Sequence, residues 1–166
     1  MSNVCILGID PGSRLTGYGV ILYNKSGQYQ YQASGCIKMR DEDLGARLQQ
    51  IYLGISTVIE RYQPNEVAIE QVFVNQNVMS ALKLGHARGA AMVAVANHKL
   101  PIAEYTPRRI KQAVTGSGAA EKNQVQQTIK YLLNLSGTMT MDASDALAVA
   151  ICHAHSRKSL ANGIII

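Results

Sequence analysis

The chain has 166 residues, of which 47% are apolar and 16% are charged, and its formal net charge is +5. This length suits one domain with a full-sized core, and no apolar run approaches the roughly 18–20 residues of a membrane span. The three cysteines (Cys5, Cys36 and Cys152) are far apart in apolar sequence, and the first residues lack the basic segment of a secretory signal. We therefore expect a cytoplasmic protein with no membrane partner, no disulfide framework and no cysteine-built metal site.

The first predicted element is an apolar strand that begins at Val4 and ends in Asp10, followed by the turn-forming pair Pro11–Gly12. An apolar run without alternation is typical of a strand buried on both faces. Residues 17–23 and 28–37 predict two more strands around a turn, which gives an antiparallel meander. Asp10 either caps its own turn or belongs to a functional site, since a charge at the end of a central strand is costly unless it is neutralised.

The rest of the chain alternates helices and strands. A helix opens at the acidic residues 41–43 and carries an apolar stripe to residue 59, and residues 66–71 predict a strand that again ends near a carboxylate, Glu70. A loop at 73–76, a small-residue helix at 77–97, a strand at 101–105 and a short helix at 107–114 follow. A link at 116–120 leads to helices over 121–135 and from 142 to about 155. This order predicts an α/β fold with one mixed sheet.

Four carboxylates are expected to converge. Asp10 and Glu70 end two apolar strands that we expect to lie side by side, and Asp142 and Asp145 share one face of a helix start. The helix dipole alone accounts for many such pairs, but the apolar residues that follow bury this helix and draw its acidic start toward the core. Clustered carboxylates repel unless cations intervene, and oxygen-only ligands suit Mg²⁺ or Mn²⁺. Two ions roughly 3.5–4 Å apart would support attack of water on a phosphodiester.

Charge and motif leave other function classes open at this point. If the four acids form one site, the remainder carries 16 basic against seven acidic side chains, which favours a polyanionic partner but also describes a merely basic protein. The segment from Asp10 to Gly17 is also similar to the first phosphate loop of actin-like ATPases and sugar kinases, which need a second domain. A nucleic-acid-binding module without catalysis would have no use for four converging acids.

Five segments closely resemble the RuvC family of bacterial Holliday junction resolvases. They are residues 8–19 (GIDPGSRLTGYG), 68–73 (AIEQVF), 80–85 (SALKLG), 118–126 (GAAEKNQVQ) and 142–148 (DASDALA), in family order across nearly the whole chain. The resemblance implies an RNase H-like fold with a central five-stranded mixed sheet flanked by helices, in a nuclease domain over residues 1–156 with a short tail over 157–166. It also implies a homodimer that resolves four-way DNA junctions by paired symmetric nicks in homologous recombination and DNA repair, with the RuvA–RuvB branch-migration complex as partner.

The resemblance also assigns roles to individual residues. The family's metal-binding catalytic acids correspond to Asp10, Glu70, Asp142 and Asp145, which would hold two Mg²⁺ ions per subunit, with Mn²⁺ as a substitute. The family's active-site lysines correspond to Lys111 and Lys122. Its base-contacting aromatic residue corresponds to Phe73. Arg14 and Lys83 are further candidate DNA contacts, although Arg14 also fits a plain surface residue. We expect His153 and His155 at the surface or an interface, because about 16 Å of helix separates His153 from Asp142.

Overall fold

The computed structural model describes residues 3–40, 43–72 and 77–161. Within these ranges the elements are β1 (Val4–Asp10), β2 (Leu15–Tyr23), β3 (Tyr29–Lys38), α1 (Leu44–Tyr62), β4 (Glu66–Glu70), α2 (Val78–Asn97), β5 (Ile102–Tyr105), α3 (Pro107–Thr115), α4 (Lys122–Leu132) and α5 (Met141–Ala161). Their order and type confirm the predictions made from the sequence. Across these same ranges, no helix is long and apolar enough to cross a membrane.

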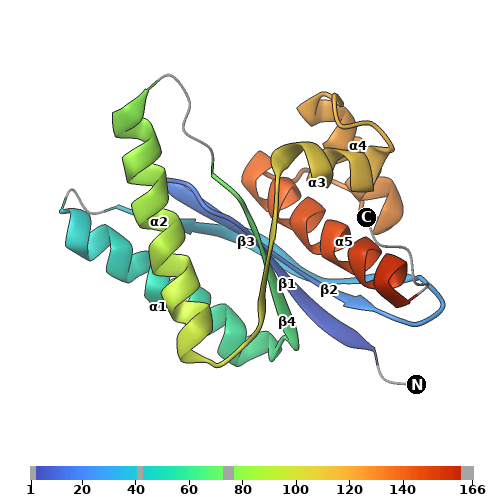
Figure 1. Cartoon of the computed structure of the whole chain (residues 1–166), viewed down its shortest axis with the longest axis horizontal. Helices are drawn as coiled ribbons and strands as arrows, with labels where there is room; N and C mark the ends of the chain where they lie inside the picture. The colour runs from blue at the N-terminus through green and yellow to red at the C-terminus, as the bar shows by residue number, and fades with distance from the viewer. Residues whose placement is uncertain (1–2, 41–42, 73–76, 162–166) are drawn as a thin grey trace.

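The five strands form one mixed sheet in the order β3-β2-β1-β4-β5 (Figure 1). Strands β1, β2 and β3 pair antiparallel, which confirms the predicted meander, whereas β1 with β4 and β4 with β5 pair parallel. In the β1–β4 ladder Ile9 lies opposite Ile69, so the next residues, Asp10 and Glu70, end their strands at the same edge. The expectation that these two strands are neighbours is confirmed.

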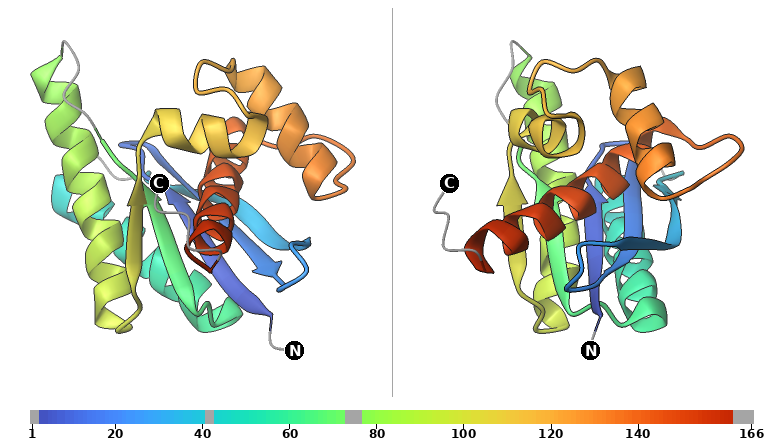
Figure 2. Two further views of the ribbon diagram at one scale, coloured as in Figure 1. Left: turned by 45° about the vertical axis from the view of Figure 1, so that its right-hand side comes forward. Right: turned by 90° about the vertical axis from the view of Figure 1, so that its right-hand side faces the viewer.

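Helices cover both faces of the sheet. Helices α1 and α2 pack on one face, and α5 lies on the other with α3 and α4 beside it (Figures 1 and 2). Alternate residues of β1 enter the two cores: Leu7 and Ile9 face α1 and α2, whereas Ile6 faces α5. Because residues two apart share a strand face, Gly8 and Asp10 lie on the α5 side of the sheet.

Two glycines let α5 rest directly on the sheet. A Cβ atom on Gly8 would lie 2.1 Å from the carbonyl oxygen of Ala146, and one on Gly17 would lie 2.1 Å from that of Asp142. Any larger residue at either position would collide with the helix backbone. Gly17 is also the antiparallel partner of Asp10, so the first turn of α5 lies beside the end of β1.

Two helix ends differ from the sequence predictions. The last helix does not stop near residue 155 but continues to Ala161, and within it the hydroxyl of Ser156 donates to the carbonyl oxygen of Cys152 one turn back. The predicted boundary at residue 156 therefore falls inside α5. Helix α4 ends at Leu132 rather than at residue 135, since the chain turns into the left-handed conformation at Asn134. The predicted loop at 73–76 lies outside the described residues.

Candidate active site

The carboxyl edge of β1 and β4 brings Asp10 and Glu70 into contact. Their side chains are hydrogen-bonded to each other and both are largely shielded from water. The pKa of Asp10 is raised to about 9. Burial is the largest cause, followed by the hydrogen bond to Glu70 and the charges of Glu70, Asp145 and Asp142. Burial also raises the pKa of Glu70. The pair therefore retains a shared proton at neutral pH.

Asp145 faces this pair from the first turns of α5. Burial raises the pKa of its carboxyl group, and the ammonium group of Lys122 opposes that rise. The Nζ atom of Lys122 lies 3.5 Å from Oδ2 of Asp145, on a side chain that is 68% exposed. Such an exposed ion pair adds little stability, so its position matters more for chemistry than for folding.

The two predicted lysines come from helices that follow β5. Helix α3 begins at Pro107 after an N-cap at Thr106, whose hydroxyl accepts from the backbone N–H of Arg109, and it carries Lys111. Lys122 is the first residue of α4. Both lysine charges lower the pKa of Asp145 and of Glu70, against the larger effect of burial.

These side chains share one pocket of about 230 Å³. Its polar lining is Asp10, Glu70, Asp145, Lys111 and Lys122, and its apolar lining is Pro107, Ile110, Val125 and Ala148. Five of the six predicted catalytic residues therefore meet, although they come from five different elements. The apolar walls lower the local dielectric and strengthen every charge interaction inside the pocket.

The sixth predicted residue, Asp142, lies at the margin. It is half-buried in the first turn of α5, directly over Gly17, and is not among the residues that line the pocket. Its charge nevertheless raises the pKa of both Asp10 and Asp145, so it belongs to the same electrostatic cluster. The structure thus places three acids inside the pocket and the fourth beside it.

The acids have the right chemistry for a hard divalent cation. In the part of the chain that the structure describes, no three His, Cys, Asp or Glu side chains are arranged to hold an ion. The present contacts account for this, because Asp10 bonds to Glu70 while Asp145 approaches Lys122. The donor set still fits Mg²⁺ or Mn²⁺, since it consists only of carboxylate oxygens, and burial together with the neighbouring carboxylates raises the pKa of Asp10 to about 9 when no cation is present.

The remaining predicted DNA contacts lie elsewhere. Arg14 is exposed in the turn between β1 and β2, where its carbonyl oxygen accepts from the backbone N–H of Met39. Lys83 is exposed on α2, beside a mainly apolar pocket between α1 and α2 that Met79 and Leu82 also line. Neither side chain lines the carboxylate pocket. Phe73 lies outside the described residues.

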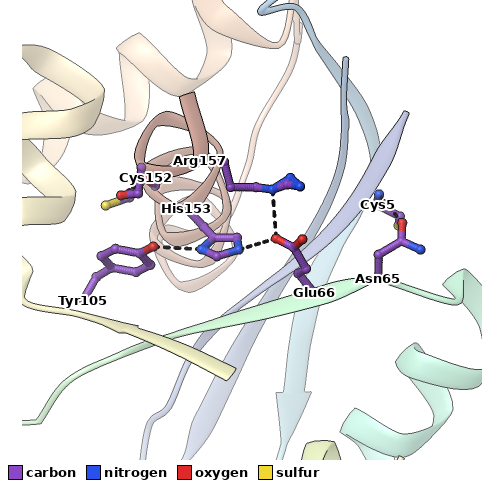
Figure 3. A network of polar contacts seen from close by, with 8 residues as sticks. Cys5, Asn65, Glu66, Tyr105, Cys152, His153 and Arg157 are labelled. Carbon is purple, nitrogen blue, oxygen red and sulfur yellow. Dashed lines mark hydrogen bonds and ion pairs between the residues drawn. The ribbon is translucent and has the colours of Figure 1, made fainter. Parts of the chain in front are cut away.

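Of the two positions expected for His153, the surface position is wrong, and the interface position stays a prediction. Its side chain is only 12% exposed, Nε2 lies 2.7 Å from Oε2 of Glu66, and Nδ1 lies 2.8 Å from the hydroxyl of Tyr105 (Figure 3). His155 points away from this cluster and its ring lies 5.9 Å from that of Tyr29. No periodic signal predicts the contacts of His153, because α5 is apolar nearly all round.

Comparison with known proteins shows the family to which the chain belongs. The family model described as crossover junction endodeoxyribonuclease RuvC matches residues 6–153, a range that contains all six predicted catalytic residues. The chain belongs to the RuvC family. The member from Colwellia psychrerythraea is 58% identical over 158 residues, which cover 94% of this chain and 90% of that protein. The member from Pseudoalteromonas translucida is 56% identical over 155 residues, which cover 93% of this chain and 88% of that protein.

The solved RuvC structures confirm the fold. Thermus thermophilus RuvC in complex with a Holliday junction substrate aligns with a TM-score of 0.86 and 30% sequence identity, over 94% of this chain and 96% of that one. RuvC structures have an RNase H-like fold, so the predicted fold class is correct. Family membership favours a junction endonuclease over an actin-like nucleotide-binding protein or a non-catalytic module.

Proposed function

We propose that this chain is a divalent-metal-dependent endonuclease that resolves four-way DNA junctions by paired symmetric nicks. The observation that carries the proposal is the pocket in which Asp10, Glu70 and Asp145 face Lys111 and Lys122. Membership of the RuvC family and the junction substrate bound by the Thermus relative support the choice of DNA substrate. The function belongs to homologous recombination and DNA repair, in the cytoplasm.

The acids would hold two Mg²⁺ ions, with Mn²⁺ as a substitute, and these ions would activate water and stabilise the leaving 3′ oxygen. Asp10 and Glu70 must first release their shared proton, so ion binding and proton release are coupled. Asp145 and, from the margin, Asp142 would supply the remaining oxygen ligands. The ammonium groups of Lys111 and Lys122 are placed at the pocket to stabilise the negative charge that develops on the non-bridging phosphate oxygens.

A symmetric dimer would supply two such pockets for two nicks. Helix α2 presents an exposed stripe of apolar residues, with Val78 62%, Leu82 51% and Val93 59% exposed. Gly85 and Gly89 lie between them with open space where a side chain would be, which permits close approach of a second helix. We propose this stripe as the self-complementary seam. The RuvA–RuvB complex is the expected partner from the family.

The test uses a synthetic four-way junction labelled in turn on each strand, with a linear duplex of the same sequence as control. We expect nicks in two opposed strands of the junction with Mg²⁺ or Mn²⁺, and none with a chelator. The variant Asp10→Asn should bind the junction as the wild type does but not cut it. Equal cutting of the linear duplex, or metal-independent cutting, would reject the proposal. Turnover of ATP would instead favour a nucleotide-binding protein.

A further inference from the structure

A second polar cluster joins the middle of α5 to the start of β4. The ring of His153 lies between the hydroxyl of Tyr105, at 2.8 Å from Nδ1, and the carboxylate of Glu66, at 2.7 Å from Nε2 (Figure 3). The Nε atom of Arg157, one turn further along α5, also lies 3.0 Å from Oε2 of Glu66. The cluster thus connects α5 with two parallel strands, β4 and β5.

The contacts define one arrangement of protons. Burial lowers the pKa of His153, which keeps the ring neutral at neutral pH. Nε2 must donate to the carboxylate of Glu66, which only accepts, so Nδ1 is left as an acceptor for the Tyr105 hydroxyl. Every polar atom of the ring is therefore satisfied, and rotation or sliding of α5 would break both bonds at once.

The middle of the α5 interface consists of apolar contacts. Its residues 146–152 are all buried and apolar; Ala146 and Ala150 lie against Gly8 of β1, and Leu147 lies against Gly19 of β2. Dispersion contacts of this kind are strong in total but weakly directional. Directional bonds would therefore add to the close fit at Gly8 and Gly17 in fixing the helix along its axis.

The distance between the polar cluster and the catalytic pocket is nearly the same along α5 as along β4. Asp145 and His153 are eight residues apart on α5, which is about 12 Å of helix. Glu66 and Glu70 are four residues apart on β4, which is about 13 Å of strand. Because Asp145 meets Glu70 in the pocket while His153 meets Glu66, the two elements run in opposite directions and are matched in length between these contacts.

We propose that Glu66, His153 and Tyr105 form a positioning cluster that sets the axial position of α5 and thereby the placement of Asp142 and Asp145 against Asp10 and Glu70. The proposal rests on the function proposed above. None of the three residues lines the catalytic pocket, so they act through the acids and not on the substrate. A displacement of reacting groups by about 1 Å costs up to about a hundredfold in rate, so loss of the cluster should slow cleavage without weakening junction binding.

The test compares His153→Ala, His153→Gln and Tyr105→Phe with the control His98→Ala. His98 is also a half-buried histidine, with Nδ1 2.9 Å from the carbonyl oxygen of Ala94 and Nε2 3.7 Å from Glu60, but it joins α2 to α1 on the opposite face of the sheet. Single-turnover cleavage at saturating protein, the junction Kd and thermal unfolding are measured for each. Thermal unfolding is repeated with increasing Mg²⁺, which reports ion binding without DNA or cleavage.

We expect His153→Ala to lower the saturated rate by about tenfold to a hundredfold, with a Kd within about twofold of wild type. The Mg²⁺ concentration for half-maximal thermal stabilisation should also rise. His153→Gln should recover most of the rate, because its amide places an N–H near the position of Nε2. Tyr105→Phe removes only a hydroxyl and should lower the rate by about fivefold. This variant tests the proposal if His153→Ala does not fold. His98→Ala should leave all three measurements near wild type.

Several results would overturn the proposal. One is a folded His153→Ala variant that cuts at the wild-type saturated rate, and another is a His153→Gln variant as slow as His153→Ala. A variant that loses junction affinity while keeping its saturated rate would assign the cluster to DNA binding instead. If wild-type protein does not cut junctions, the proposed function fails; if wild type cuts and the variants cut equally well, only the positioning role fails.

Discussion

Replacing Gly17 by alanine should slow cleavage although no catalytic side chain is replaced. The new Cβ would lie 2.1 Å from the carbonyl oxygen of Asp142, whereas such atoms essentially never approach within 3.0 Å, so strand and helix must separate by about 0.9 Å. The nearest atoms are the backbone carbonyl oxygen and carbon of Asp142, which cannot rotate away as a side chain would. We therefore expect Gly17→Ala to move the first turn of α5, which carries Asp142, by roughly this distance, and to lower single-turnover cleavage by up to about a hundredfold.

The same change should cost stability as an overpacked core does, by about 1–3 kcal/mol, which is roughly 2–12 °C in Tm for a chain of this length. The assay is single-turnover junction cleavage at saturating protein, well below the Tm of the variant, with circular dichroism to show that it is folded. Gly45→Ala is the control, because its Cβ would meet only the flexible carboxylate of Asp43, at 3.2 Å. A folded Gly17→Ala protein that cuts as fast as Gly45→Ala would refute the idea that this glycine sets the position of the acids.

Three further changes test the pocket and the seam. Asp10→Asn should raise the Tm of the metal-free protein. The pKa of Asp10 is raised from 3.8 to about 9, so between these values the folded protein still holds a proton that the unfolded chain has released, and the wild type loses stability as the pH rises whereas the neutral amide does not. Melting curves should show no difference near pH 4 and a growing one up to pH 9. Lys122→Ala should lower the single-turnover rate by about tenfold or more with little change in Tm, since the Lys122 side chain is 68% exposed. If the rate is unchanged while the junction affinity falls and its salt dependence becomes smaller by about one unit of slope, Lys122 is a phosphate contact instead. Leu82→Asp should yield a folded monomer in sedimentation at micromolar concentration, because this side chain is 51% exposed and its loss costs the core little; a dimer of unchanged affinity would place the seam elsewhere.

The topology of the site could be predicted from the sequence because it depends on local patterns. An apolar run that ends in Asp10 and another that ends in Glu70 predict two buried strands, and parallel neighbours end at one edge. The spacing of Asp142 and Asp145 fixes a common helix face whatever the tertiary structure. For Lys111 and Lys122 the patterns predicted only surface helices, and it was the family resemblance that associated them with the site.

The features that set distances inside the site could not be predicted in the same way. Gly8 and Gly17 are ordinary strand glycines until α5, well over a hundred residues later, is placed on top of them, and their spacing carries no information about that helix. The sequence predicts His153 at the surface or an interface because about 16 Å of helix separates it from Asp142, and periodicity defines no inward face on a helix that is apolar on almost every side. Its burial follows from the partners Glu66 and Tyr105, which satisfy both ring nitrogens and remove the cost of burying a polar ring. Short sequence motifs thus predict the candidate catalytic residues, whereas the distances between these residues depend on contacts between distant segments of the chain. The substitutions at Gly17 and His153 would disturb these contacts.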